Sequence, residues 1–176
     1  METQQLDEAL KQAIASMEIA PDMSQVEFFR GLVALFQKDY RTAESFLEPL
    51  FQKHPDNIAA SNNLALALIG QNDESKRRRA LEYAEGNAKK FPKASLTLST
   101  YGWVLYRLGR LEDAEKTLSP LCSDENVTID TAYYMARVWV DRGHKAEAKK
   151  LLEVALKHTR VAMFQREAEE LLQELK

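Results

Sequence analysis

Alanine recurs about every 34 residues along the chain, and this period constrains the fold more than any other feature. The repeated segment reads acidic or polar residue, then Ala, followed by two polar residues in most units and by Leu and a polar residue at Ala9 and Ala80. We call these alanines the anchors. The anchors are Ala9, Ala43, Ala80, Ala114 and Ala148. Their successive spacings are 34, 37, 34 and 34 residues. A period of roughly 20 to 50 residues is typical of arrays in which each unit buries its apolar face against its neighbours. We therefore expect a stack of similar units.

A second small residue in each unit marks a place where two helices can approach closely. It precedes the anchor by twelve positions in three units and by fifteen in another. These residues are Gly31, Ala65, Gly102 and Ala136. A bulky side chain at a helix crossing would hold the two backbones apart, because ridges of one helix pack into grooves of the other. The pattern predicts helical hairpins whose helices meet at these small residues.

Glycines and prolines lie where a turn and a helix end are expected. Gly109 and Gly143 precede their anchors by five residues, and Lys38 has that place in the first full unit. The first three anchors are followed, twelve residues later, by Pro21, Pro55 and Pro92, each of which would end a helix. With only six glycines and five prolines in 176 residues, and no long alternating Val, Ile or Thr run, the chain is predicted to be all-α.

A 34-residue helix-turn-helix unit with these small residues, turn glycines and closing prolines resembles the tetratricopeptide repeat (TPR). The segment YGWVLYRLGRLEDAEKTL, residues 101–118, matches the family pattern best. The resemblance covers the whole chain and implies an α-solenoid, a right-handed superhelix of hairpins forming one domain over 1–176. The early Trp of the family is missing from every unit, and Asn126 and Arg160 replace closing prolines.

The same alignment gives the expected element boundaries. Four full repeats are predicted at about 24–57, 58–94, 95–128 and 129–162. A capping helix is predicted at 163–175, where apolar side chains gather on one side of an amphipathic pattern. A lone second helix is predicted at about 4–20, with no first helix before it. Either it continues a longer array or it serves as a natural cap, and its uncovered apolar face would also allow self-association. Pro49 and Pro120 hold equivalent places in two second helices, so a local bend is expected at each.

Composition excludes several classes of partner. The net charge of −3 and the pI of about 5.7 provide no positive field for nucleic acid or an anionic membrane. The basic run SKRRRA, residues 75–80, adjoins Asp73 and Glu74 and is interpreted as a solvated helix start. No apolar run is long enough to span a membrane, and the start lacks the pattern of a signal peptide. A single cysteine forms no intramolecular disulfide, which favours a cytoplasmic protein.

No pattern of residues in the chain indicates catalysis, a metal or a cofactor. The histidines His54, His144 and His158 occur singly, and Cys122 has no neighbouring His or Cys at ligand spacing. Glycine-rich phosphate loops, a nucleophile elbow and an HExxH motif are all missing from the sequence. We therefore predict a protein that is not an enzyme and that uses no cofactor.

The resemblance instead implies a binding groove lined by the first helix of each hairpin. The candidate groove residues are Asn62, Asn63, Ser99, Thr100, Trp103, Tyr106, Arg107, Tyr133, Tyr134 and Arg137. Amides can hydrogen-bond a peptide backbone, paired guanidinium donors suit a carboxylate, and Trp and Tyr are frequent binding anchors. On the same inner side, Phe28, Phe29, Leu32 and Leu66 are interpreted as packing between neighbouring units. Trp139 is predicted to lie in the core.

Three functions suit this architecture. The first is a protein-interaction scaffold that binds an extended peptide or short helix of a partner in the concave groove. The second is a structural segment of a larger multidomain protein or assembly, and the third is a TPR-type chaperone for a secreted or assembled substrate. The family's two-carboxylate clamp for chaperone C-termini is not expected. Asn63 matches one clamp position, but the other four hold Phe28, Leu32, Leu96 and Thr100.

Overall fold

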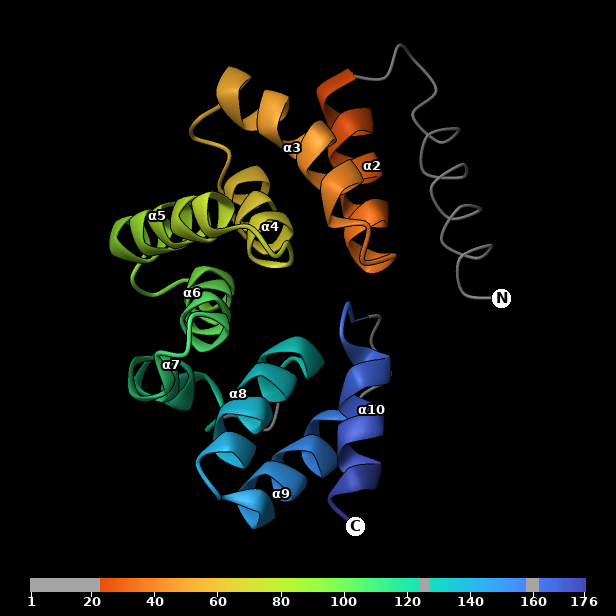
Figure 1. Cartoon of the computed structure of the whole chain (residues 1–176), viewed down its shortest axis with the longest axis vertical. Helices are drawn as coiled ribbons and strands as arrows, with labels where there is room; N and C mark the ends of the chain where they lie inside the picture. The colour runs from red at the N-terminus through yellow and green to blue at the C-terminus, as the bar shows by residue number, and fades with distance from the viewer. Residues whose placement is uncertain (1–22, 124–126, 158–161) are drawn as a thin grey trace. The chain divides into compact units, whose positions relative to one another are not determined.

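The computed structural model describes residues 23–123, 127–157 and 162–176, and every regular element in these ranges is a helix (Figure 1). The lone helix predicted at 4–20 lies outside the described residues. The chain divides into two compact units, one ending at Asn87 and the other beginning at Ala88. The all-α prediction is confirmed for the described residues, whereas the single domain over 1–176 stays a prediction.

The first unit contains two helical hairpins. Its helices are α2 (Met23–Phe36), α3 (Tyr40–Lys53), α4 (Ile58–Ile69) and α5 (Glu74–Lys90), the last of which ends in the next unit. Side chains before three of them cap free backbone N–H groups. Asp39 accepts from Thr42 N at 3.1 Å, Asn57 from Ala60 N at 3.0 Å, and Asp73 from Lys76 N at 3.0 Å. These caps fix where each helix starts.

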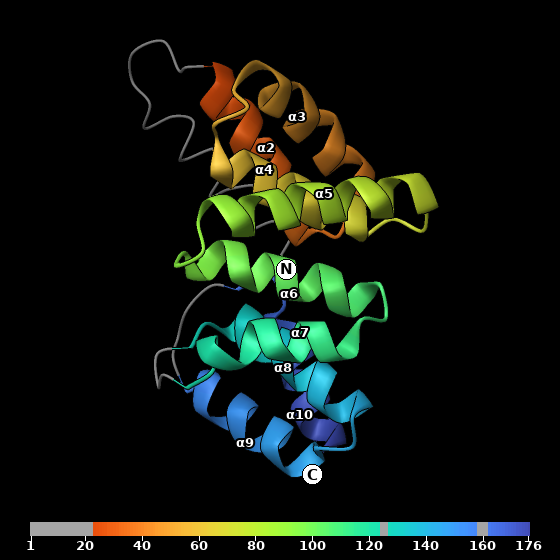
Figure 2. The same ribbon diagram turned by 90° about the vertical axis from the view of Figure 1, so that its left-hand side faces the viewer.

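The second unit contains two further hairpins and a final helix. Its helices are α6 (Ser95–Arg107), α7 (Leu111–Leu118), the 3₁₀ turn η1 (Ser119–Leu121), α8 (Ile129–Asp141), α9 (Lys145–Ala155) and α10 (Gln165–Glu174). Within this unit α6 and α7 lie side by side (Figure 2), and α8 packs against α6, α7, α9 and α10. The helix pairs fall within the predicted repeats, and α10 falls within the predicted capping helix.

The turns confirm the predicted role of their glycines. Gly109 has a φ of 77° and Gly143 a φ of 87°, which are left-handed values that glycine adopts without a steric penalty. Lys38 holds the equivalent place in the first hairpin and has a φ of 59° despite its side chain. These three hairpin turns therefore use the same backbone conformation.

Small residues allow close approach at the hairpin crossings. A Cβ atom added to Gly31 would lie 2.7 Å from Leu47 Cγ, and one added to Gly102 would lie 2.6 Å from Leu118 Cδ2. Each leucine follows its anchor alanine by four residues. The anchors in the described residues, Ala43, Ala80, Ala114 and Ala148, are fully buried. The packing predicted from the period is thus present in both units.

The two prolines expected to bend equivalent helices behave differently. Pro49 lies inside α3, which continues to Lys53, whereas α7 ends at Leu118 and Pro120 lies in the 3₁₀ turn η1. Continuing α3 past its proline buries Leu50, while Leu121 after Pro120 is only half-buried. The apolar burial gained beyond Pro49 compensates for the hydrogen bond that proline removes.

Asp130 in the first turn of α8 holds the start of α10 by hydrogen bonds. Its Oδ1 accepts from Phe164 N at 2.8 Å and its Oδ2 from Met163 N at 3.3 Å, just before α10 begins. Asp130→Ala should lower the free energy of unfolding by about 1 to 2 kcal/mol, because two backbone N–H groups lose their acceptor. Urea denaturation followed by circular dichroism measures this change.

A suitable control for that substitution is Asp113→Ala. Asp113 is an exposed residue in the first turn of α7 and pairs with the exposed Arg110 three residues earlier. Asp113→Ala should lower the free energy of unfolding by about 0.5 kcal/mol or less. Equal losses for the two variants would mean that Asp130 contributes nothing through α10.

Candidate functional site

Five aromatic rings of the second unit form one continuous cluster around Trp103. Its indole stacks on Tyr106 of the same helix at 5.2 Å between centroids and on Tyr134 of α8 at 4.5 Å. Tyr133 and Phe164 complete the cluster, stacked on each other at 5.3 Å, and both also approach Trp103. Packing of α8 between α6 and α10 brings these rings together. Such ring pairs stabilise the fold by more than the burial of their apolar area alone.

Most of this cluster is covered by its own members. Trp103 is 5% exposed, Tyr133 9% and Tyr134 3%, so these three predicted groove residues have little surface left for a ligand. Burial raises the pKa of Tyr133 to about 12, as expected for a phenol that loses hydration. These three rings therefore pack against neighbouring side chains and offer little surface for contact with a partner.

Three of the predicted residues remain half-exposed at the edge of the cluster, and we call Tyr106, Arg107 and Arg137 the rim. The guanidinium of Arg107 lies over the Trp103 ring at 5.6 Å from its centroid. Arg137 Nε donates to the Tyr106 hydroxyl at 3.3 Å, and that hydroxyl donates to Asp141 Oδ2 at 2.9 Å. Burial, which is the largest cause, and the bond to Asp141 together raise the pKa of Tyr106. The rim thus combines a ring, two cations and a neutral hydroxyl.

Ser99 and Thr100 lie inside the second unit. Ser99 is 6% exposed, and its hydroxyl hydrogen-bonds that of Thr131 at 2.8 Å, which also bonds Thr128 at 2.8 Å. Thr100 is 2% exposed. Their polar atoms are internal, so the structure does not bring these two residues to the rim.

The two asparagines belong to the first unit and bond within it. Asn62 is 1% exposed, and its Oδ1 accepts from Asn87 Nδ2 at 2.9 Å. Asn63 donates from Nδ2 to Ala59 O of its own helix at 2.8 Å. Phe28, Phe29, Leu32 and Leu66, which were interpreted as packing residues, are half-buried. The two phenylalanines line a cleft of about 740 Å³ next to Leu50 and His54.

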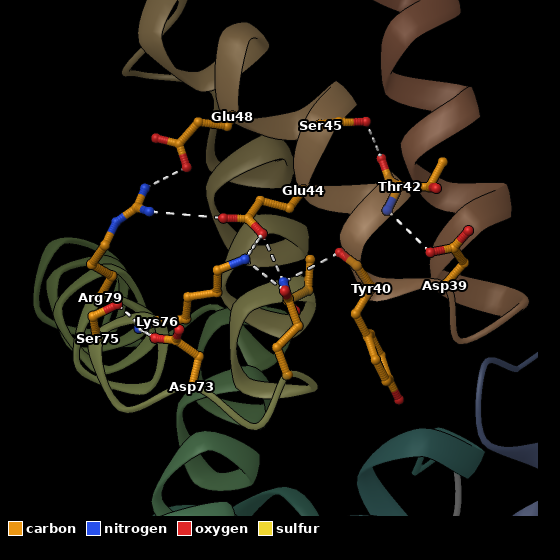
Figure 3. A network of polar contacts seen from close by, with 12 residues as sticks. Asp39, Tyr40, Thr42, Glu44, Ser45, Glu48, Asp73, Ser75, Lys76 and Arg79 are labelled. Atoms are coloured by element: carbon orange, nitrogen blue, oxygen red, sulfur yellow. Dashed lines mark hydrogen bonds and ion pairs between the residues drawn. The ribbon is translucent and has the colours of Figure 1, made fainter.

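An ion-pair network between α3 and α5, which was not predicted, accounts for part of the basic run 75–80 (Figure 3). Glu44 accepts from Lys76 Nζ at 2.6 Å and from Gln71 Nε2 at 2.7 Å, and Arg79 pairs with Glu48. The sequence contained a signal for it. Glu44 and Glu48 are four residues apart on one helical face, and Lys76 and Arg79 are three apart on another. The run is therefore less solvated than predicted.

Replacing both acids, Glu44→Gln with Glu48→Gln, should lower the free energy of unfolding by about 1 to 2 kcal/mol at low salt. The loss should shrink at about 1 M salt, because the pairs are only partly buried and are screened. Urea denaturation at both salt concentrations measures this. Glu82→Gln, an exposed change on α5, serves as the control. A loss that is independent of salt would argue against an electrostatic contribution.

Three further properties of the described ranges concern metal ligands, the single thiol and the polarity of the helices. Within residues 23–123, 127–157 and 162–176, no three His, Cys, Asp or Glu side chains are grouped as metal ligands would be. Burial raises the pKa of the Cys122 thiol to about 12, so little thiolate is present near neutral pH. Across the same ranges, every helix is too short or too polar to traverse a bilayer.

Comparison with known proteins places the fold. No family model matches the sequence, and no curated protein matches it. Among solved structures, TTC0263, a thermophilic TPR protein of Thermus thermophilus, is similar with a TM-score of 0.73 and 17% identity. The match covers 97% of this chain and 92% of that one.

Two further solved structures agree. A tetratricopeptide repeat protein of Parabacteroides merdae has a TM-score of 0.74 and 13% identity, covering 99% of this chain and 66% of that one. YrrB, described as a TPR protein with an unusual peptide-binding site, has a TM-score of 0.53 and 16% identity, covering 96% and 86%. This chain therefore has the TPR fold, as the resemblance in its sequence implied.

Proposed function

We propose that this TPR-fold chain is a protein-interaction scaffold that binds an extended peptide or a short helix of a partner protein. The observation that carries the proposal is the rim of the second unit, where Tyr106, Arg107 and Arg137 stay half-exposed on a buried aromatic base. One similar structure, YrrB, is described as having a peptide-binding site, which supports the same class of function.

The rim has the properties of a binding surface. Tyr and Arg side chains are enriched among residues that dominate interface energies. Tyr106 and Arg107 are both held against Trp103, so little conformational entropy is lost when a ligand contacts them. We expect an affinity near the micromolar level, about 8 kcal/mol, because polar groups must lose water on binding.

A cytoplasmic location and self-association through residues 4–20 remain predictions from the sequence.

Affinity capture from the native lysate tests the proposal. The bait would be the full chain beside a Tyr106→Ala, Arg137→Glu double variant whose helical circular dichroism is unchanged. Trp103 is left intact because it is buried and its truncation would destabilise the unit. Arg110→Glu, at the exposed turn before α7, serves as the matched charge control.

The proposal predicts partners that the double variant loses and the Arg110→Glu control retains. Those partners should bind again when Tyr106 and Arg137 are restored. If all three baits capture the same proteins, the rim is not the binding site and the proposal is wrong.

A further inference from the structure

Arg137 differs from other arginines of the chain in its partner. Arg79, Arg110 and Arg142 each pair with a carboxylate, of Glu48, Asp113 and Glu115 respectively. Arg137 instead donates from Nε to the neutral Tyr106 hydroxyl, and it forms no ion pair with any residue in the described ranges. A half-buried guanidinium has lost some of its hydrogen bonds to water, and a carboxylate is the acceptor that would replace them best.

Tyr106 holds this guanidinium in place. Because its hydroxyl donates to Asp141, its oxygen lone pairs remain available to accept from Arg137 Nε. The two terminal nitrogens of Arg137 have no hydrogen-bond partner among the described residues. A guanidinium fixed through Nε, with both terminal nitrogens unbonded within the described part of the chain, is arranged for a two-pronged bond to a carboxylate.

Nearby charges limit how much negative charge the rim would accept. The charges of Arg107, Arg137 and Glu167 all act on the pKa of Tyr133, so each lies within electrostatic range of its hydroxyl. Asp141 adds a further negative charge beside Tyr106. Two cations opposed by two carboxylates leave a nearly neutral surface, which suits one carboxylate from a ligand and would repel a run of acidic residues.

On the basis of the proposed function, we propose that the rim recognises a single carboxylate of the partner peptide through Arg137, with an aromatic or aliphatic residue beside it on Tyr106. The carboxylate could come from an Asp or Glu side chain or from the peptide's C-terminus. The chemistry is the same for both sources, so the test is designed to separate them.

Two libraries of random dodecapeptides, one with free and one with amidated C-termini, provide the probes. Each library is screened for peptides that bind the full chain and, separately, for peptides that bind the Arg110→Gln variant, which is the charge control. The selected peptides are then titrated against the full chain, Arg137→Gln and Tyr106→Ala by fluorescence anisotropy. In each peptide the acidic group is also neutralised, by Glu→Gln or Asp→Asn exchange or by amidation.

Neutralising the carboxylate should weaken binding to the full chain about tenfold or more, and to Arg137→Gln less than about twofold. Enrichment confined to the free library would assign the C-terminal carboxylate, and enrichment in both would assign the side chain. Peptides with two or more adjacent acids should not be enriched. Arg110→Gln should bind as the full chain does.

Two results would overturn the inference in different ways. One such result is that peptides bind while neutralising their carboxylate weakens binding to the full chain and to Arg137→Gln equally. In that case carboxylate recognition by Arg137 is wrong, while the scaffold function stands. If no peptide is selected, or if binding is unaffected by both Tyr106→Ala and Arg137→Gln, the proposed binding site is wrong as well.

Discussion

Replacing Trp103 with alanine should lower the free energy of unfolding by about 3 to 5 kcal/mol, the largest single effect expected in the chain. The indole is 5% exposed and contacts four other aromatic rings from α6, α8 and the residue before α10. Its removal would leave a cavity where three segments meet. Urea denaturation followed by circular dichroism and by tyrosine fluorescence would measure the loss.

Trp139 provides the matched control, and its place corrects a prediction made from the sequence. It was expected in the core, but it is half-buried, and its Nε1 donates to Glu115 at 3.0 Å, which also pairs with Arg142. Trp139→Ala should therefore cost less than Trp103→Ala, about 1 to 3 kcal/mol. Equal losses for the two tryptophans would contradict the central place given to Trp103.

Gly102→Ala should lower the free energy of unfolding by about 1 to 3 kcal/mol, although alanine is the better helix former. The added Cβ would lie 2.6 Å from Leu118 Cδ2, and Leu118 is fully buried, so α6 and α7 must move apart or the leucine must leave its rotamer. Thermal and urea denaturation would both show the loss.

Gly86→Ala is the control that separates packing from helix propensity. Gly86 is exposed inside α5, and a Cβ added there meets no atom within 4 Å. Alanine at this position should raise the free energy of unfolding by about 0.5 to 1 kcal/mol. If both glycine substitutions stabilised the chain, the close approach at Gly102 would not limit the packing of the hairpin.

The hairpins could be predicted because their requirements are local and repeated. Close helix crossing needs small residues at fixed spacing, and a tight left-handed turn favours glycine, so both appear in the sequence with the same period. Lys38 shows how far this extends. It replaces the turn glycine, yet it adopts the same backbone conformation because the surrounding hairpin requires it.

The candidate site could be predicted only in part, because helical periodicity gives the direction of a side chain and not its depth. Trp103 and Tyr133 were placed on the inner side of their helices, but contact with Phe164, from beyond the last full hairpin, leaves them little exposed. The Arg137 to Tyr106 bond joins residues 31 positions apart, and no local pattern indicates such a pair. The same holds for Asp130 and the start of α10.

Amide hydrogen exchange of the full chain, with and without a peptide selected as described above, would test the proposed binding surface most directly. Binding at the rim should slow exchange in the C-terminal halves of α6 and α8, around Tyr106, Arg107 and Arg137, and should leave α3 and α9 unchanged. Slowed exchange confined to α3, α5 or α9, with none around the rim, would contradict a partner site on the second unit.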